Sequence, residues 1–180
     1  MTTRAQGLQA FYSGPVWKAN REAANATMVD SDNVLLLRPA RPESAFSLEN
    51  SERPPHGTTE IPKAIVTATV YYFDSPVGKN FIDLFEHALK PTLVESGASL
   101  LAYFVTESSE NTFPALPVRE GENVFVWFSL FANAAAFDQY CVTLDQSRKW
   151  REEVSKVSKQ QLKKSPEVLK LSPTSRSHLR

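Results

Sequence analysis

Residues 14–39 read GPVWKANREAANATMVDSDNVLLLRP, and residues 147–173 read SRKWREEVSKVSKQQLKKSPEVLKLSP. Each segment has a small residue followed three positions later by a tryptophan, Trp17 or Trp150, and each ends in a short apolar strand closed by proline. Val34 follows Trp17 by 17 residues, and Val168 follows Trp150 by 18. Because an internal repeat dictates architecture, the chain is expected to hold one complete unit preceded by the end of another. Both tryptophans are expected at matching helix starts and largely buried.

The repeat and the composition together predict the domain organisation. Residues 1–39 form the C-terminal remnant of a first repeat, a helix interrupted at Gly14-Pro15 and a strand. Residues 40–61 are polar and rich in proline, which predicts a linker or an extended strap. Residues 63–173 form the complete unit, and residues 174–180 form a tail.

The complete unit contains strand, helix, strand, strand, helix and strand. Strands are expected at 63–73, 99–106, 123–131 and 168–171, because these stretches are apolar and rich in β-branched and aromatic residues. A helix follows Ser75-Pro76 and ends at Gly97, and Asn133 caps the next helix. This order predicts an α+β fold of the ferredoxin-like split βαβ type.

The strands predict two buried faces, since apolar residues occupy both sides. The third strand has aromatic residues on one face (Phe125, Trp127 and Phe131) and apolar ones on the other (Val124, Val126, Phe128 and Leu130). Leu100, Ala102 and Phe104 are expected opposite Leu101, Tyr103 and Val105. Helices cover one face, so a second sheet is expected on the other, which makes an α/β barrel within one chain or across a homodimer. Trp127 and Tyr103 are expected near that contact.

The stretch FYSGPVWKANREAANATMVDSDNVLLLRPA resembles the end of the first repeat in bacterial NIPSNAP-family proteins. The S-x-x-W-R segment with VLKLSP resembles the end of the second repeat. The resemblance implies the dimeric α/β-barrel fold, whose superfamily includes cofactor-free monooxygenases and isomerases. It also implies that a first unit's strands and helix are missing before residue 5, and it transfers no catalytic residues. Pairing with another NIPSNAP-like unit is the alternative to a homodimer.

Composition restricts the function classes. Net charge is zero, which argues against bulk attraction to nucleic acid, and the basic segment 148–180 is interpreted as the solvated side of a helix. One cysteine gives no disulfide framework, and the N-terminus is no signal peptide. No stretch reaches 18 apolar residues, so no membrane span is expected. The expected location is the cytoplasm.

No motif identifies a reaction. His56, His87 and His178 are scattered, so no metal site is expected, although His87 could serve as a base or bind haem iron. No phosphate-binding loop is present, and no cofactor is expected. Cys141 shares an apolar helix face with Phe137, which predicts a buried, inert thiol.

Five residues are candidates for a ligand site. Tyr71, Tyr103 and Trp127 lie on strands that would line or back a barrel, where they could enclose a small apolar or aromatic ligand, although the rings could simply fill the core. Arg21 and Asn25 share a helix face and could hold a carboxylate or pair with another unit.

Two function classes follow. The first, which the sequence favours, is a non-catalytic interaction module. The alternative is a small-ligand-binding barrel that acts as a cofactor-independent monooxygenase or isomerase. A closed cavity of a few hundred Å³ with converging polar groups would support the alternative, whereas a filled barrel would support the module.

Overall fold

The computed structural model describes residues 1–49, 52–158 and 162–180. Residues 50–51 of the expected linker and 159–161 of the expected complete unit lie outside the described residues. The chain divides into two compact units, which are described separately. The first contains residues 1–37 and 107–122, and the second contains residues 38–106 and 123–180.

The first unit contains two helices, α1 (Thr2–Ser13) and α2 (Pro15–Asn25), separated at Gly14. The break and the proline at the first position of α2 agree with the prediction. The loop 107–122 joins this unit. Arg4 Nη1 donates to Asn111 Oδ1 at 2.9 Å, and the Tyr12 ring stacks on Phe113 with ring centres 5.5 Å apart.

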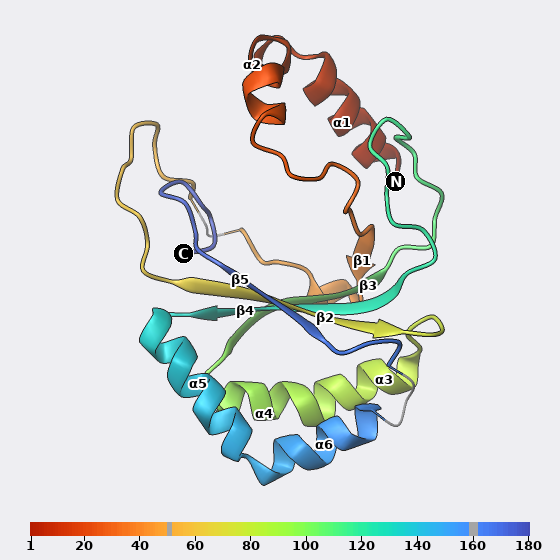
Figure 1. Ribbon diagram of the computed structural model, residues 1–180, viewed down its shortest axis with the longest axis vertical. Coiled ribbons are helices and arrows are strands. Elements are labelled where there is room, and N and C mark those ends of the chain that lie inside the picture. The colour runs from red at the N-terminus through yellow and green to blue at the C-terminus, as the bar shows by residue number, and fades with distance from the viewer. Residues whose placement is uncertain (50–51, 159–161) are drawn as a thin grey trace. The chain divides into compact units, whose positions relative to one another are not determined.

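The second unit is an antiparallel sheet with helices on one face (Figure 1). The sheet has the order β1-β3-β4-β2-β5. Its strands are β1 (Leu37–Pro39), β2 (Ile65–Phe73), β3 (Ser99–Thr106), β4 (Asn123–Phe131) and β5 (Glu167–Leu171). The helices are α3 (Lys79–Leu84), the π-helical turn η2 (Phe85–Leu89), α4 (Lys90–Glu95), α5 (Ala134–Gln146) and α6 (Arg148–Ser158). This architecture confirms the predicted α+β, ferredoxin-like arrangement.

The sequence located most elements closely. β3 and β4 have the expected bounds, and the Asn133 side chain accepts a hydrogen bond from the Ala136 N–H at 2.9 Å. The first helix of the unit begins at Lys79 rather than after Ser75. The strand expected at 34–37 instead covers Leu37–Pro39 and pairs with β3 at the edge of the sheet.

Trp17 and Trp150 each occupy the third residue of a helix, α2 and α6 respectively. Both are only partly buried, so the expectation of large burial is wrong for these two rings. The internal repeat itself stays a prediction.

The helix-covered face of the sheet holds the main core. Phe81, Phe85, Leu89 and Leu93 recur every four residues along α3, η2 and α4, and each is 4% exposed or less. They pack against aromatic residues of the strands, with ring centres of Phe85 and Phe125 4.6 Å apart.

The helices cover the face that carries Trp127 and Tyr103, not the opposite face. The expectation that these two residues lie near a contact between sheets is therefore wrong. Apolar alternation predicts that both faces are buried, but it does not distinguish the face that takes the helices. Strand β3 has a register shift between Leu100 and Ala102. Because of this shift, Leu100 pairs with Ser129 and packs on the helix-covered face with Tyr103, so the expectation that Leu100 lies opposite Tyr103 is wrong.

The other face of the sheet is covered in part by the strap, residues 40–49 and 52–62, and by the C-terminal tail (Figure 1). The strap begins with the short helix η1 (Pro42–Ser44), whose Ser44 hydroxyl donates to the Tyr103 carbonyl oxygen at 2.7 Å. The Phe46 ring lies 5.0 Å from Phe128. Arg176 Nε donates to the Pro54 carbonyl oxygen at 3.0 Å, which ties the tail to the strap.

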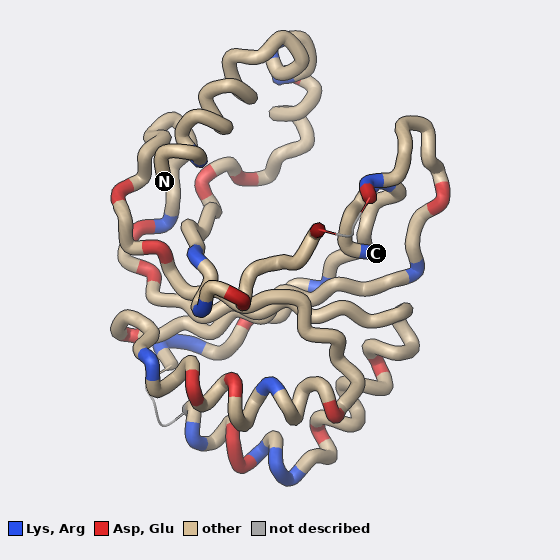
Figure 2. The backbone as a smooth tube through the Cα atoms, turned by 180° about the vertical axis from the view of Figure 1, so that it is seen from behind, with Lys and Arg blue, Asp and Glu red and all other residues tan. Residues whose placement is uncertain are grey.

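Basic and acidic side chains alternate along the outer helices of the second unit (Figure 2). In α6, Arg148 pairs with Glu152 at 2.7 Å and Lys149 pairs with Glu95 of α4 at 3.1 Å. These pairs support the interpretation of the basic segment as a solvated helix surface. Among the described helices, none combines the length and apolarity needed to cross a membrane.

Candidate functional site

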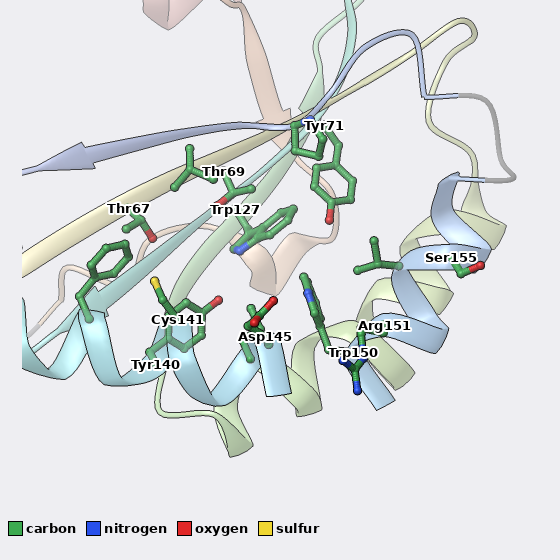
Figure 3. A pocket seen from close by; sticks show the side chains of 15 residues that line it. Thr67, Thr69, Tyr71, Trp127, Tyr140, Cys141, Asp145, Trp150, Arg151 and Ser155 are labelled. Carbon is green, nitrogen blue, oxygen red and sulfur yellow. The ribbon is translucent and has the colours of Figure 1, made fainter. Parts of the chain in front are cut away.

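A pocket of about 640 Å³ lies between the sheet and the helices α5 and α6 (Figure 3). The alternation of β2 sends Thr67, Thr69 and Tyr71 towards the helices, and the pairing of Thr69 with Trp127 adds an indole from β4. These four residues form the sheet side of the pocket.

Two helices form the opposite wall. The cap at Asn133 starts α5, and the apolar side of this helix then presents Phe137, Tyr140, Cys141 and Leu144. The Ser147 hydroxyl oxygen accepts a hydrogen bond from the Trp150 N–H at 3.1 Å at the start of α6. This capping bond holds Trp150 in the first turn, and Trp150 and Val154 complete the wall.

The pocket is bounded largely by aromatic rings. Tyr71 and Trp127 meet edge to face, with ring centres 4.9 Å apart. Tyr140 and Trp150 face them from the helices (Figure 3), and Phe137 of α5 also lines the pocket. Such a lining suits a small apolar or aromatic molecule, because most of its surface would contact carbon.

Several polar side chains on the sheet side carry no hydrogen bond to another described residue. Tyr71 and Trp127 are each 3% exposed, and Thr67 and Thr69 are also buried. In the described chain, the fully buried polar side-chain atoms that lack a hydrogen-bond partner are Ser129 Oγ and Glu153 Oε2. The polar atoms of the four sheet-side residues also lack a partner but are not among these fully buried atoms, so they are accessible from the pocket. Buried polar groups normally have partners, and unpaired ones in a pocket indicate where a ligand can bind.

The tyrosine hydroxyls of the pocket are protonated over the physiological range. Burial raises the pKa of Tyr71 to about 12. Burial also raises the pKa of Tyr140. Charge repulsion from the nearby Cys141 and Tyr71 raises it further. Both hydroxyls can therefore donate hydrogen bonds to a bound molecule.

Two charged residues and a thiol complete the lining. Asp145 and Arg151 are both exposed, and their side chains have no ion-pair or hydrogen-bond partner in the described residues. Cys141 is exposed at the wall, so the prediction of a buried thiol is wrong. Partial desolvation, with a smaller contribution from Asp138, raises the pKa of this thiol, which keeps it in the less reactive protonated form.

The structure brings together two of the five predicted site residues, Tyr71 and Trp127. Tyr103 lies on the same face of the sheet, but its hydroxyl donates to Glu86 Oε1 at 2.6 Å and it does not line the pocket. Arg21 and Asn25 are exposed on α2 of the first unit, and neither lines the pocket.

Tyr103 belongs to a separate polar cluster on the helix side of the sheet. Arg41 of the strap contacts Asp83 at 2.5 Å and Glu86 at 3.3 Å. Burial raises the pKa of Glu86, but hydrogen bonds from Tyr103 and Arg41 outweigh it and lower the pKa overall. These groups satisfy one another, which indicates a structural role for the cluster.

Sequence reasoning missed Tyr140, Thr67, Thr69 and Asp145. Tyr140 lies on the apolar face of α5 with Phe137 and Cys141. Such a face is expected to be core, and only the geometry distinguishes a pocket wall from packing. The three histidines are apart: His87 is exposed in η2, with Nδ1 2.7 Å from the Asp83 carbonyl oxygen. Within the described part of the chain, no group of three or more His, Cys, Asp or Glu side chains could hold a metal ion.

The fold is similar to that of solved NIPSNAP family proteins. A NIPSNAP family protein from Agrobacterium tumefaciens C58 is 17% identical, with 72% of this chain covering 100% of that one at a TM-score of 0.52. A second one from this strain, described as of unknown function, is 14% identical over the same shares, with a TM-score of 0.53. A NIPSNAP-like domain protein from Burkholderia xenovorans is 21% identical and covers 64% of this chain and 89% of that one, with a TM-score of 0.49.

The first two similarities confirm the predicted resemblance at the level of the fold. No protein-family model matches the chain, and no curated protein sequence matches it.

Proposed function

We propose that this protein binds a small apolar or aromatic molecule in the pocket between the sheet and helices α5 and α6. The observation that carries the proposal is an aromatic-lined space of about 640 Å³ into which the polar atoms of Tyr71 and Trp127 open without a hydrogen-bond partner in the described chain. A space of this size falls within the usual range for ligand sites, and a few directional polar groups among apolar walls are typical of them. The pocket meets the expected test in size and in its polar groups but is open to solvent on one side rather than closed. We therefore take the ligand-binding alternative as the proposal to test first.

A neutral fluorescent probe, N-phenyl-1-naphthylamine, tests the proposal together with two matched variants. Cys141→Phe places a ring in the wall of the pocket, whereas Val142→Phe adds the same ring next to it on α5, where Val142 is 50% exposed and does not line the pocket. We expect one probe to bind per wild-type chain and per Val142→Phe chain. The Cys141→Phe variant should bind at least about tenfold more weakly, because the added ring occupies the binding space.

Equal probe affinity in all three proteins would place binding elsewhere. No detectable binding to the folded wild-type protein would refute the proposal for ligands of this class. Circular dichroism of each variant establishes that the comparison is made between folded proteins.

A chemical step on the ligand, as in a cofactor-independent monooxygenase or isomerase, would need a proton-transfer group. The carboxylate of Asp145 is the candidate in the lining, since it has no partner in the described residues. Once a substrate is known, Asp145→Asn should retain binding and lose turnover. Retained turnover would exclude Asp145 as the base.

Association with a second copy is the second candidate function, and β5 supports it. This outer strand pairs with β2 alone, and its apolar residues Leu169 and Leu171 are 50% and 44% exposed. An exposed apolar edge strand is a template for pairing with another chain. These two residues lie on the face opposite the helices, in register with Ala68 and Val66.

Sedimentation velocity tests this association. We expect the wild-type protein to sediment as a homodimer and Leu169→Lys to shift it towards monomer, because a charge on the edge strand opposes pairing. A wild-type monomer at high concentration would exclude this candidate.

A further inference from the structure

The polar groups deepest in the pocket differ in kind from those at its rim. On the sheet side, Trp127 Nε1 can only donate a hydrogen bond, and Tyr71 carries a protonated hydroxyl. Both residues are 3% exposed, and neither side chain has a hydrogen-bond partner among the described residues. The inner wall therefore offers one group that can only donate, the Trp127 N–H, beside the hydroxyls of Tyr71, Thr67 and Thr69, which can donate or accept.

A donor that opens into the pocket without a protein partner is left to water, and a ligand that supplies an acceptor there replaces that water with a direct hydrogen bond. Figure 3 shows the Tyr71 hydroxyl and the Tyr140 hydroxyl directed into the space below the Trp127 ring. Because aromatic rings surround this space, it suits a planar apolar ligand that carries an oxygen atom at the end nearest the sheet.

We propose, building on the proposed function, that the ligand is an uncharged aromatic carbonyl compound whose oxygen accepts a hydrogen bond from Tyr71 or Trp127 on the inner wall of this pocket. A carbonyl oxygen has lone pairs and no hydrogen, so it can accept from the Trp127 N–H, which only donates, and from the Tyr71 hydroxyl, which is protonated. The aromatic part of the ligand lies between Trp127 and the rings of α5 and α6.

An anionic ligand matches this pocket less well. The carboxylate of Asp145 lines the pocket, and the guanidinium of Arg151 points away from Tyr71 and Trp127 (Figure 3). The raised pKa values of Tyr71 and Tyr140 have burial as their largest cause, which is the environment that disfavours any charge.

A cationic ligand also fits the inner wall poorly. An ammonium group donates hydrogen bonds, so it would leave the Trp127 N–H without an acceptor. The carboxylate that could pair with it belongs to Asp145, an exposed residue.

Four naphthalenes of similar size test the inference: 2-acetonaphthone, 2-isopropylnaphthalene, 2-naphthoate and 2-naphthylmethylammonium. Dissociation constants are measured by ligand-observed NMR for the wild-type protein, Tyr71→Phe, Trp127→Phe and the control Tyr12→Phe. Tyr12 has the same hydroxyl but belongs to the first unit and does not line the pocket. Two pocket variants are used so that the loss of one by misfolding leaves the test intact.

We expect the ketone to bind the wild-type protein roughly 2- to 10-fold more tightly than the hydrocarbon, the range for one neutral hydrogen bond. The ketone's advantage should shrink in Tyr71→Phe or Trp127→Phe and persist in Tyr12→Phe. The hydrocarbon should bind the wild-type protein, Tyr71→Phe and Tyr12→Phe alike. In Trp127→Phe the smaller ring also removes contact with the naphthalene, so there the measured quantity is the ratio of ketone to hydrocarbon affinity.

Two kinds of failure are distinguishable. If the hydrocarbon, the carboxylate or the ammonium binds the wild-type protein most tightly, or if the ketone's advantage survives in both pocket variants, the inference is wrong while the pocket remains a ligand site. If none of the four compounds binds, the proposed function fails for aromatic ligands.

Discussion

Tyr71 and Tyr72 are neighbours on β2, yet they lie on opposite faces of the sheet in different environments. The Tyr72 hydroxyl donates to Glu167 Oε2 at 2.6 Å, and the ammonium of Lys164 lies 3.7 Å from the centre of its ring. The hydroxyl of Tyr71, on the helix-covered face, has no partner in the described residues and opens into the pocket. Both residues are almost fully buried, so burial alone does not distinguish a structural tyrosine from a candidate binding one.

The contrast extends to the two faces as a whole. On the strap-covered face, Phe46 packs on Phe104 and Phe128 with ring centres 5.5 and 5.0 Å away. On the helix-covered face, the core is filled around Phe85, but the region around Trp127 and Trp150 keeps an open volume. The strap-covered face also leaves a space of about 380 Å³ beside Phe46, Leu48 and Val66, so the two faces differ in the size and in the aromatic lining of the space that they leave open.

The largest expected effect tests whether Trp127 supports the core as well as the pocket. Trp127→Ala removes a ring that contacts Tyr71 and Phe85, with ring centres 4.9 and 5.5 Å away, and should lower the free energy of unfolding by about 3–5 kcal/mol. Trp150→Ala should cost less, because Trp150 is only partly buried. Urea denaturation followed by circular dichroism measures both. Equal losses would show that the pocket wall is packed as tightly as the core.

The second effect is a pH dependence that belongs to Tyr71. Its folded-state pKa of about 12 exceeds the unfolded value near 10, so its stabilising contribution is complete below about pH 10 and is lost as the pH rises towards 12. Above about pH 10, this group alone should reduce the free energy of unfolding by up to about 1.4 kcal/mol per pH unit.

Urea midpoints between pH 8 and 11 measure this slope. Tyr71→Phe should flatten it, although Tyr103 and Tyr140, whose pKa values are also raised, contribute to the remainder. An identical slope in the wild-type protein and the variant would mean that the Tyr71 hydroxyl is solvated in the folded state.

A third test compares the two tyrosines by deletion of one oxygen each. Tyr72→Phe removes a hydrogen bond to a carboxylate and should cost about 1 kcal/mol, at the low end for charged partners because Glu167 is exposed. Tyr71→Phe at pH 7 should be neutral within about 0.5 kcal/mol, because no bond to a described residue is lost. The shift in urea midpoint measures the loss of stability in each variant. A larger loss in Tyr71→Phe than in Tyr72→Phe would contradict the assignment of Tyr72 as the structural tyrosine.

The smallest effect concerns Ser129, which pairs with Thr67 on the helix-covered face. Its hydroxyl is buried and has no hydrogen-bond partner in the described chain. Ser129→Ala should be neutral or stabilise the protein by less than about 1 kcal/mol, because it removes an unsatisfied polar atom. A destabilisation above about 1 kcal/mol, measured by thermal and urea unfolding, would indicate that this hydroxyl has a partner in solution.

Much of the fold could be predicted from local sequence signals. β-branched and aromatic runs gave the bounds of β3 and β4, and Asn133 marked the start of α5 because a cap is a short-range interaction. The shifted register at Leu100 and the identity of the helix-covered face depend on tertiary packing. Neither has a local signal, and both were predicted wrongly.

The candidate site was predictable only in part for the same reason. Tyr71 and Trp127 were identified because they are aromatic residues with a polar atom on buried strands. Tyr103 is also an aromatic residue with a polar atom on a buried strand, but its hydroxyl donates a hydrogen bond to Glu86 of η2. The spacing of residues in the sequence does not reveal this hydrogen bond. Cys141 and Tyr140 were assigned to packing, since an amphipathic helix face has the same pattern over a solid core as over a cavity.

The π-helical turn η2 bears on the spacing of the buried residues in the helix that contains it. Four-residue steps in a regular α-helix advance each side chain about 40° beyond a full turn, so a series of four would wind off the sheet. Phe81, Phe85, Leu89 and Leu93 follow this spacing, yet all four remain buried. The wider turn at Phe85–Leu89 compensates for this rotation, as one extra residue in a helix would. The segment therefore behaves as a helix with an insertion. Removing one residue from this turn would return the helix to regular winding and leave Leu89 and Leu93 about seven and eleven residues after Phe81, spacings that keep them on the same face.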